Sequence, residues 1–420
     1  MIELATEEQA AVQDAKASSI WRNRTFLIVF TSYSISLLGN TFHSIALNLW
    51  VLQTTGSAKL MSLVLITHLV TSMLFGSFAG TIADRTNRRR LMWTVDFIRF
   101  ILVAAIALLI YLPNIPFYFI IILTALVAFA GTFRTPAFQA SLVEIVGKSN
   151  ITQAVGAISI SDNLIRIGGF ALGGIAVAAF GGAFAIAIDS ATFLLSAVLL
   201  LIAGKFPYSS QEVSNQSKGL FKQDFLEGFR YVWTNAFTRA VIVLLPLVMF
   251  FFLSTFMLIQ VMAVKVWMAT PFVFGLLESC IPLGYVIGSI VIMKFDKHLK
   301  KRGRWVIGST IAMGPIFIAI AQSSTAAYAL PFILLVGLLF SFSTTIVFII
   351  LRVAIEPSLQ GRVFGLLGSL TSVAPPIGLA LYSALSDLYG PAIIITYSGA
   401  AMLIMGLAAY FGMKEIRRFD

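Results

Sequence analysis

The most informative side chains of this sequence are ionisable residues placed inside long apolar stretches. Asp96 and Arg99 lie three residues apart, and Asp162 and Arg166 lie four apart. Residues at these spacings share one face of a helix, so each pair can neutralise itself as a structural ion pair. Alternatively, each pair is a charge relay that changes partners between two conformations. Either role would offset the cost of about 2.5–3.5 kcal/mol for an ionisable group at the centre of a membrane-spanning helix.

Two other carboxylates, Asp189 and Glu278, stand in apolar stretches without a basic residue close to them in sequence. We expect Asp189 to be a structural residue or a member of such a relay. A desolvated carboxylate favours its neutral form, so Glu278 could take up and release a proton or bind a cationic substrate. The alternative for Glu278 is a contact at the edge of its helix, with Lys265 as its partner.

Polar and aromatic side chains in other stretches could line a substrate cavity. Asn40 and His43 are three residues apart and therefore share a helical face. The histidine is either a packed hydrogen-bonding residue or a cavity residue that titrates near neutral pH. Phe252 and Phe256 belong to a phenylalanine-rich stretch. They either pack and face lipid or form an apolar wall for a large amphipathic substrate.

The composition indicates which elements must carry these residues. Of the 420 residues, 59% are hydrophobic and 11% are charged, whereas a soluble domain carries about 25% charged residues. These values argue against a water-soluble enzyme, a disordered protein and a disulfide-stapled secreted domain. The single cysteine, Cys280, cannot form an internal disulfide. We therefore predict an all-α membrane protein.

Twelve apolar stretches are each long enough to cross a bilayer, which takes roughly 20 helical residues. They are 26–52, 58–83, 90–112, 116–138, 151–180, 183–204, 239–263, 271–293, 304–322, 326–351, 362–387 and 390–412. The polar segment 205–238 separates the first six from the last six. We predict two pseudo-symmetric six-helix bundles, 26–204 and 239–413, joined by this cytoplasmic linker and flanked by cytoplasmic tails at 1–25 and 414–420. Two such halves are typical of a secondary transporter with its site between them.

The basic residues predict the orientation of the spans. Of the 29 Lys and Arg residues, only Lys59 and Lys265 fall in loops of one side, and Arg99 and Arg166 fall within spans. All the others lie on the opposite side, which by the positive-inside rule is cytoplasmic. Both termini are therefore expected in the cytoplasm. The net charge of +11 is explained by a membrane and does not require a nucleic-acid partner.

A loop after the second span carries the motif that identifies the superfamily. Its sequence from 80 to 90 resembles the Gly-x-x-x-Asp-Arg-x-Gly-Arg-Arg loop of the major facilitator superfamily, with Asn87 in place of the second glycine. Asparagine tolerates a left-handed backbone better than most residues, so we expect the turn to persist. The resemblance implies a conformational latch that engages the start of the eleventh span when the cytoplasmic side is closed. Its expected members are Gly80, Asp84, Arg85, Arg88, Arg89, Arg90 and Arg362.

Glycines at helical spacing predict close contacts between helices. Gly76 and Gly80 in the second span correspond to Gly284 and Gly288 in the eighth. The fifth span carries a glycine cluster that is similar to the antiporter motif Gly-Pro-x-x-Gly-Gly, although Phe170 stands in the position of the proline. We expect helix packing at its members Gly169, Gly173 and Gly174.

Further segments narrow the resemblance to one branch of the superfamily. They are 55–58, 96–99, 189–196 and 361–364. Together they are similar to the exporter branch that contains macrolide efflux proteins and the enterobactin exporter. The resemblance implies a proton-coupled exporter of small amphipathic molecules. It would work by alternating access, as a monomer in the bacterial cytoplasmic membrane.

Other functions have less support. The sequence contains no His-Glu-x-x-His motif, and the segment ending in Gly147-Lys148-Ser149 has Leu142 where a P-loop needs its first glycine. We therefore expect no enzyme activity, metal, cofactor or direct use of ATP. A membrane sensor that has lost transport and a channel remain as lesser alternatives. Within transport, macrolide-like drugs compete with siderophores and with endogenous metabolites or lipids as substrates.

Overall fold

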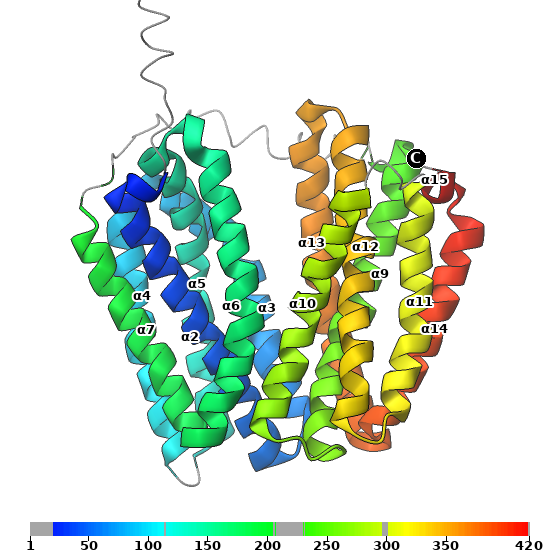
Figure 1. Ribbon diagram of the computed structural model, residues 1–420, viewed down its shortest axis with the longest axis horizontal. Coiled ribbons are helices and arrows are strands. Elements are labelled where there is room, and N and C mark those ends of the chain that lie inside the picture. Colours follow the sequence, from blue (N-terminus) through cyan, green and yellow to red (C-terminus); the bar gives the residue numbers. More distant parts are fainter. Residues whose placement is uncertain are drawn as a thin grey trace, which may run out of the picture. The chain divides into compact units, whose positions relative to one another are not determined.

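The structure, a computed structural model, describes residues 20–112, 115–204, 206, 230, 232–295 and 301–418. Regular structure in these residues is helical throughout (Figure 1). Twelve of the helices are long and apolar enough to cross a membrane, as predicted. They are α2 (Arg24–Thr55), α3 (Ala58–Arg85), α4 (Arg88–Tyr111), α5 (Phe117–Val146), α6 (Ile151–Phe180), α7 (Gly182–Ile202), α9 (Ala236–Lys265), α10 (Pro271–Phe295), α11 (Arg302–Gln322), α12 (Ala326–Ala354), α13 (Pro357–Tyr389) and α14 (Pro391–Gly412). The short helix α15 (Lys414–Arg418) follows α14.

The helices form two compact units. Unit 1 contains the described parts of Met1–His43, Leu74–Gly169 and Ala183–Glu212. Unit 2 contains those of Ser44–Met73, Phe170–Gly182 and Val213–Asp420. Unit 2 therefore includes one end of α2, α3 and α6 together with all the helices from α9 onward. Most of the predicted linker 205–238 lies outside the described residues, so its role stays a prediction.

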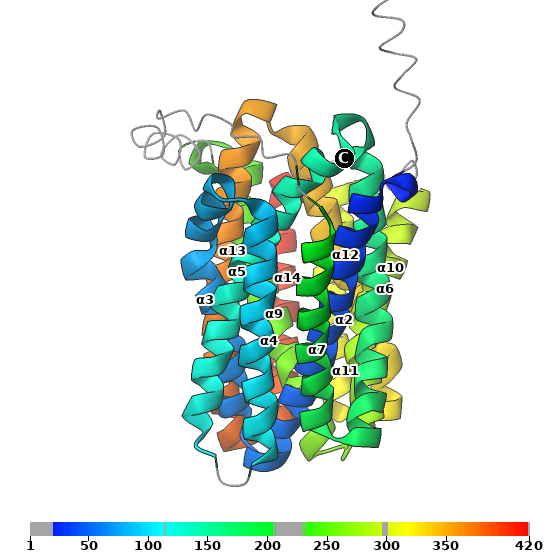
Figure 2. The same cartoon turned by 90° about the vertical axis from the view of Figure 1, so that its left-hand side faces the viewer.

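In unit 1, small and polar side chains bring the helices together. Figure 2 shows α2 beside α7, and the Ser32 and Ser196 hydroxyls of these helices lie 2.7 Å apart. Gly39 allows this approach, because a Cβ there would overlap Thr192 Oγ1 on α7. Gly169 allows α6 to approach α2 in the same way, since a Cβ there would overlap Thr41 Oγ1. Membrane helices pack in this way because small residues let their backbones approach closely.

In unit 2, glycines hold α10 against α12. A Cβ on Gly284 would overlap the carbonyl oxygen of Leu334, and one on Gly337 would overlap that of Ile281. Gly288 lies in the same contact, with Leu338 O 2.7 Å from the position of its Cβ. Two predicted packing glycines thus lie at a helix contact. By contrast, a Cβ on Gly76 or Gly80 would meet no described atom within 4 Å, so the packing role of these two glycines stays a prediction.

We expect Gly284→Val to destabilise unit 2, because its Cβ would overlap a backbone oxygen that cannot rotate away. Overpacking of this kind costs about 1–3 kcal/mol or more. Gly308→Val in α11 is the matched control, since no described atom lies within 4 Å of its Cβ position. The midpoint of thermal unfolding in detergent, monitored by size-exclusion chromatography, is measured for both variants. Equal midpoints for the two variants would contradict the close α10–α12 contact.

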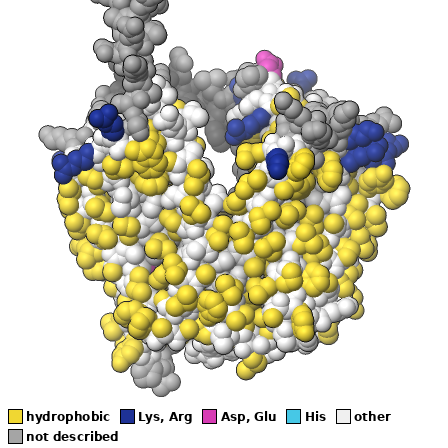
Figure 3. All heavy atoms as spheres, viewed as in Figure 1, with side chains coloured by type: hydrophobic (Ala, Val, Ile, Leu, Met, Phe, Trp, Pro, Cys, Tyr) yellow, Lys and Arg dark blue, Asp and Glu magenta, His cyan; other side chains and the backbone are white. Residues whose placement is uncertain are grey.

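Basic residues mark one end of the C-terminal helices. Arg302 and Arg304 begin α11, Arg352 ends α12 and α15 contains three Lys and Arg residues. Figure 3 shows the Lys and Arg side chains of these helices at the end where the C-terminus lies. The rest of the helix surface on this face is mainly hydrophobic. We call this the basic end.

Candidate functional site

A buried ion pair joins α4 and α5 in unit 1. Arg134 Nε donates to the Asp96 carboxylate, 3.0 Å from Oδ2 and 3.2 Å from Oδ1. Ser196 Oγ donates to Asp96 Oδ2 at 2.6 Å, and the Asp96 side chain is fully buried. The expected partner of Asp96 was Arg99, so that expectation is wrong. Arg134 comes from another helix, and spacing along one helix cannot reveal such a partner.

The remaining donors of Arg134 also have partners. One Nη donates to Ser32 Oγ at 3.3 Å and the other lies 3.4 Å from the Met92 sulfur. Because Ser32 also contacts Ser196, the carboxylate, the guanidinium and two hydroxyls form a closed network. Separating a buried ion pair leaves an uncompensated charge and costs about 3–5 kcal/mol. The geometry therefore favours a structural role for Asp96 over a relay.

Arg99 lies in a separate place on the same helix. Its Nη2 donates to Asn40 Oδ1 at 2.9 Å, and its guanidinium carbon stands 3.9 Å from the centre of the Phe193 ring. On α5, a Cβ on Gly131 would make an ordinary van der Waals contact with the guanidinium, 3.5 Å from Arg99 Cζ. A guanidinium over an aromatic face is stabilised as a cation–π contact. Arg99 Nε has no hydrogen-bond partner among the described atoms.

Asp189 has a partner that the sequence did not suggest. His43 Nδ1 of α2 lies 3.1 Å from Asp189 Oδ2 of α7, and the Asp189 side chain is 1% exposed. The ring nitrogen is not aligned for a hydrogen bond. Both residues were predicted as site residues, but for different roles. The structure brings them together because Gly39, one turn before His43, lets α7 approach α2.

Asp162 of α6 is bound by a tyrosine and not by Arg166. Tyr33 Oη donates to Asp162 Oδ2 at 3.1 Å, and the Tyr33 ring stacks on Phe138 with centres 4.4 Å apart. The ion pairs within 4 Å in the described chain do not include Asp162 and Arg166, so the predicted pairing is wrong. Arg166 is exposed and Asp162 is half-buried.

Glu278 of α10 is a buried carboxylate of unit 2. The residue is 6% exposed, and its Oε1 has no hydrogen-bond partner among the described atoms. The alternative partner, Lys265, instead lies 3.8 Å from Asp387. One turn before Glu278, Gly275 contacts Gly174 of α6, where a Cβ on Gly174 would lie 2.5 Å from Pro271 O. Gly174 thus packs against α10 as predicted. This contact leaves no room for a larger side chain between α6 and α10 at this position.

The predicted aromatic wall is partly a packed stack. Phe252 is 4% exposed and stacks on Phe340 of α12, with ring centres 3.8 Å apart. Phe256 stacks on Phe252, with ring centres 6.3 Å apart. Tyr285 of α10 lies 6.1 Å from Phe340 and pairs with Thr345 through its hydroxyl at 3.0 Å. Burial makes Phe252 a packing residue in this structure.

The loop between α3 and α4 holds its arginines against unit 1. Arg88 Nη1 donates to Glu144 Oε1 at 2.5 Å and to the Ala140 carbonyl at 2.9 Å. Arg89 donates to the carbonyls of Leu200 and Leu201, at the C-terminal end of α7. Cations are favoured at that end of a helix. These contacts inside unit 1 were not expected from the motif.

Asn87 and Asp84 have different surroundings in this loop. Asn87 caps α4: its Oδ1 accepts from Arg90 N at 3.0 Å, and its φ is −65°. The turn between α3 and α4 persists without a left-handed backbone at Asn87, and asparagine fits here as an N-cap residue. Asp84 is 63% exposed and lies 3.9 Å from Arg88. Arg85 and Arg90 are exposed and Arg362 is half-buried.

A capping contact at the N-terminus of α3 was not predicted from the sequence. Asp387, near the C-terminal end of α13, accepts from the backbone N–H groups of Ala58 and Lys59 at 2.9 and 3.1 Å. Its Oδ2 also accepts from Ser57 Oγ at 2.9 Å. Asp387 follows a mostly apolar stretch in which it resembled an ordinary end-of-span residue, so no signal in the sequence pointed to α3.

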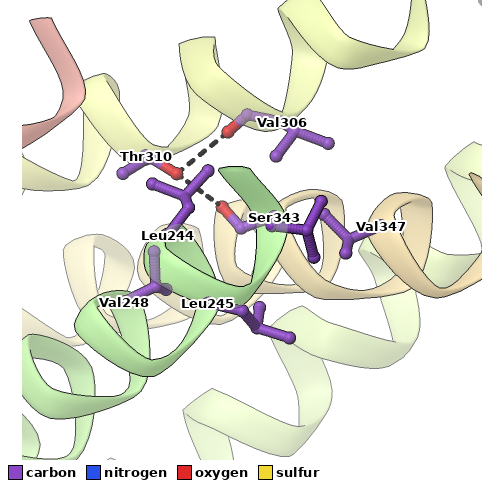
Figure 4. Close-up of a pocket in the computed structure, with 8 residues that line it drawn as sticks. Leu244, Leu245, Val248, Val306, Thr310, Ser343 and Val347 are labelled. Atoms are coloured by element: carbon purple, nitrogen blue, oxygen red, sulfur yellow. Dashed lines mark hydrogen bonds between the residues drawn. The ribbon is translucent and has the colours of Figure 1, made fainter. Parts of the chain in front are cut away.

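A small pocket lies apart from all of these residues. It lies between α9, α11 and α12 (Figure 4). Its walls are aliphatic except for Thr310 and Ser343, whose hydroxyls lie 3.3 Å apart. None of the predicted site residues lines it. In the described part of the chain, no cluster of three or more His, Cys, Asp or Glu could hold a metal ion.

Comparisons with known proteins cover almost the whole chain. The family described as transmembrane secretion effectors matches residues 15–418. Macrolide efflux protein A of Streptococcus pyogenes is 22% identical over 400 residues, which is 94% of this chain and 97% of that protein. The enterobactin exporter EntS of Shigella flexneri is 24% identical over 81% of this chain and 80% of its own length.

A solved structure of the nucleoside transporter NupG has the same fold. Its TM-score is 0.74, and the match covers 94% of this chain and all of that chain at 12% identity. At this identity the likeness concerns the fold alone.

Proposed function

The chain belongs to the transmembrane secretion effectors of the major facilitator superfamily, and on that premise we propose that it is a proton-coupled exporter of amphipathic small molecules. It is a transporter, not an enzyme, and a multi-pass protein of the inner membrane. The proposal adds the direction, the coupling ion and the class of substrate. The observation that carries it is the isolated carboxylate of Glu278, together with relatives named for efflux over nearly the full chain.

Proton coupling is supported by the surroundings of Glu278. A charged carboxylate buried without a partner costs several kcal/mol, so a proton or a cation must accompany it through the transport cycle. Asp96 already has Arg134 and Ser196 as partners. Asp189 lies beside His43, and Asp162 has an unpartnered Oδ1, so both remain second candidates. Among the membrane-embedded carboxylates, Glu278 is thus the first choice for the coupling site.

The substrate class is supported by the contacts that the arginines within the spans make. An anionic siderophore would need several free cations in the spans; Arg166 is exposed there, but Arg99 is bound to Asn40 and covered by Phe193. Arg134 is bound to Asp96. The arrangement favours a neutral or cationic amphipathic compound, of which macrolides are an example. Siderophore export remains the second candidate, because the enterobactin exporter is among the relatives.

We place the basic end, both termini and the latch loop in the cytoplasm. Lys and Arg residues are strongly enriched at this side of the spans, as the positive-inside rule requires. The exposed carboxylate of Asp84 is then available to engage the start of α13 when the cytoplasmic side closes. The end at which Asp387 caps α3 faces outward.

The proposal is tested by accumulation of a radiolabelled macrolide in a bacterium that lacks its own drug pumps. We expect cells with the protein to hold less of the drug than cells without it. A protonophore should remove the difference, since it abolishes the proton gradient. Equal accumulation in both cells would refute macrolide export and direct the assay to siderophores. A difference that resists the protonophore would refute proton coupling.

A further inference from the structure

We propose that Asp387 is a conformational lock on the outer side: its carboxylate caps the N-terminus of α3 in the closed state and releases it when that side opens. The lock rests on the alternating-access transport proposed above. It adds a residue for which neither the motif nor the relatives provide a role.

The Asp387 carboxylate binds the N-terminus of α3. The first N–H groups of an α-helix have no partners within the helix. Ala58 and Lys59 begin α3, and both donate to Asp387. Ser57 Oγ donates to the same carboxylate and accepts from Leu60 N at 3.3 Å. One side chain from the second half of the sequence therefore completes the cap of a helix from the first half.

Asp387 occupies an unfavourable position in its own helix. It lies two residues before the end of α13 at Tyr389, where the helix dipole disfavours a negative charge. Lys265 approaches only to 3.8 Å. The contact with α3 is what compensates for this unfavourable position. Because the Asp387 side chain is 26% exposed, water can replace the cap, so the contact can open reversibly.

The contact continues one turn along both helices. Ser62 Oγ donates to Ser383 Oγ at 2.8 Å, and Ser62 is 2% exposed. The residue numbers of the two contacts run in opposite directions, so α3 and α13 are antiparallel. Asp387 is thus the solvent-side end of a packed seam, and opening the seam would expose Ser62.

The antiparallel pair explains why the lock would alternate. Each helix carries a carboxylate near its C-terminal end, Asp84 on α3 and Asp387 on α13. Asp387 caps α3 in this structure, whereas Asp84 is 63% exposed. The latch motif assigns Asp84 to the N-terminus of α13. If α3 and α13 rock against each other, they are in contact at only one end at a time. The cap by Asp387 on α3 and the cap by Asp84 on α13 then exclude each other.

The experiment measures opening without a substrate. In a Cys280→Ser, Ser62→Cys background, a membrane-impermeant maleimide is applied to right-side-out and inverted vesicles, and the labelling rate of the cysteine at 62 is recorded. We expect Asp387→Asn to raise this rate about tenfold, the change expected on losing a charge-assisted cap. Glu415→Gln, an exposed carboxylate on α15, is the charge-matched control and should leave the rate unchanged. Labelling should occur from the outer side.

Further variants separate the lock from general destabilisation. Asp84→Asn should lower the rate, and the double variant should return it toward the parent, whereas a loosened protein would label faster in both single variants. Asp387→Glu keeps the charge and should stay near the parent. Lys265→Gln should have little effect. An unchanged rate in Asp387→Asn, a rise in Asp84→Asn, or an equal rise in Lys265→Gln would overturn the proposal.

The two proposals can fail separately. The labelling assay uses neither a drug nor a proton gradient, so it can succeed where macrolide efflux fails. Conversely, gradient-driven efflux with unchanged labelling in Asp387→Asn would leave the proposed function in place and refute the lock.

Discussion

Glu278→Gln is expected to abolish uphill efflux while leaving downhill exchange of substrate intact. Glutamine resembles the protonated carboxylate in size and charge, so the cavity can still change sides. It cannot release a proton, however, and the cycle loses its link to the gradient. The buried position of Glu278, with Oε1 unpartnered, is the physical reason for this expectation.

The size of the effect follows from the energy of one proton. Moving one charge across 100 mV provides about 2.3 kcal/mol, which sustains a substrate gradient of roughly 50-fold. We expect the accumulation ratio of Glu278→Gln cells to fall by up to this factor, to the level of protonophore-treated cells. Proteoliposomes with and without an imposed pH gradient measure the ratio, and counterflow in the same vesicles measures exchange.

Two controls make the result specific to this carboxylate. Glu415→Gln removes an exposed carboxylate and should keep the full accumulation ratio. Asp162→Asn removes the half-buried carboxylate held by Tyr33. If Glu278→Gln keeps its gradient dependence and Asp162→Asn loses it, the coupling site is Asp162.

Asp96→Ala is expected to be the most destabilising substitution in unit 1. It leaves Arg134 buried without its carboxylate, and removal of one partner from a buried ion pair costs about 3–5 kcal/mol. We expect a large fall in the midpoint of thermal unfolding in detergent, with a matching loss of protein in the membrane. Ser32 and Ser196 cannot replace the lost charge, because both are neutral.

The double variant Asp96→Leu, Arg134→Met tests the reason for this fall. Replacing both charges of a buried pair by apolar groups of similar size is often neutral. We therefore expect the double variant to unfold close to the parent, and the cycle to show strong coupling between the two sites. If the double variant is as unstable as the sum of both single variants, the two residues do not act as a pair.

The sequence by itself determined the spans and their number. Each span is specified by local hydropathy over about 20 residues, which does not depend on what the helix packs against. The uneven distribution of Lys and Arg and the loop at 80–90 are likewise local features. They were sufficient to predict the twelve helices and the superfamily, both of which the helices and the comparisons confirm.

Only the tertiary structure decided which buried charges meet. Asp96 pairs with Arg134, 38 positions away, and not with Arg99 on its own helix. Asp387 caps a helix that begins more than 300 positions earlier. Such partners depend on how each helix is rotated and displaced along its neighbour. The rotation and displacement are set by close contacts between helices, as at Gly39 and Gly284. The spacing of residues within one helix carries no information about them.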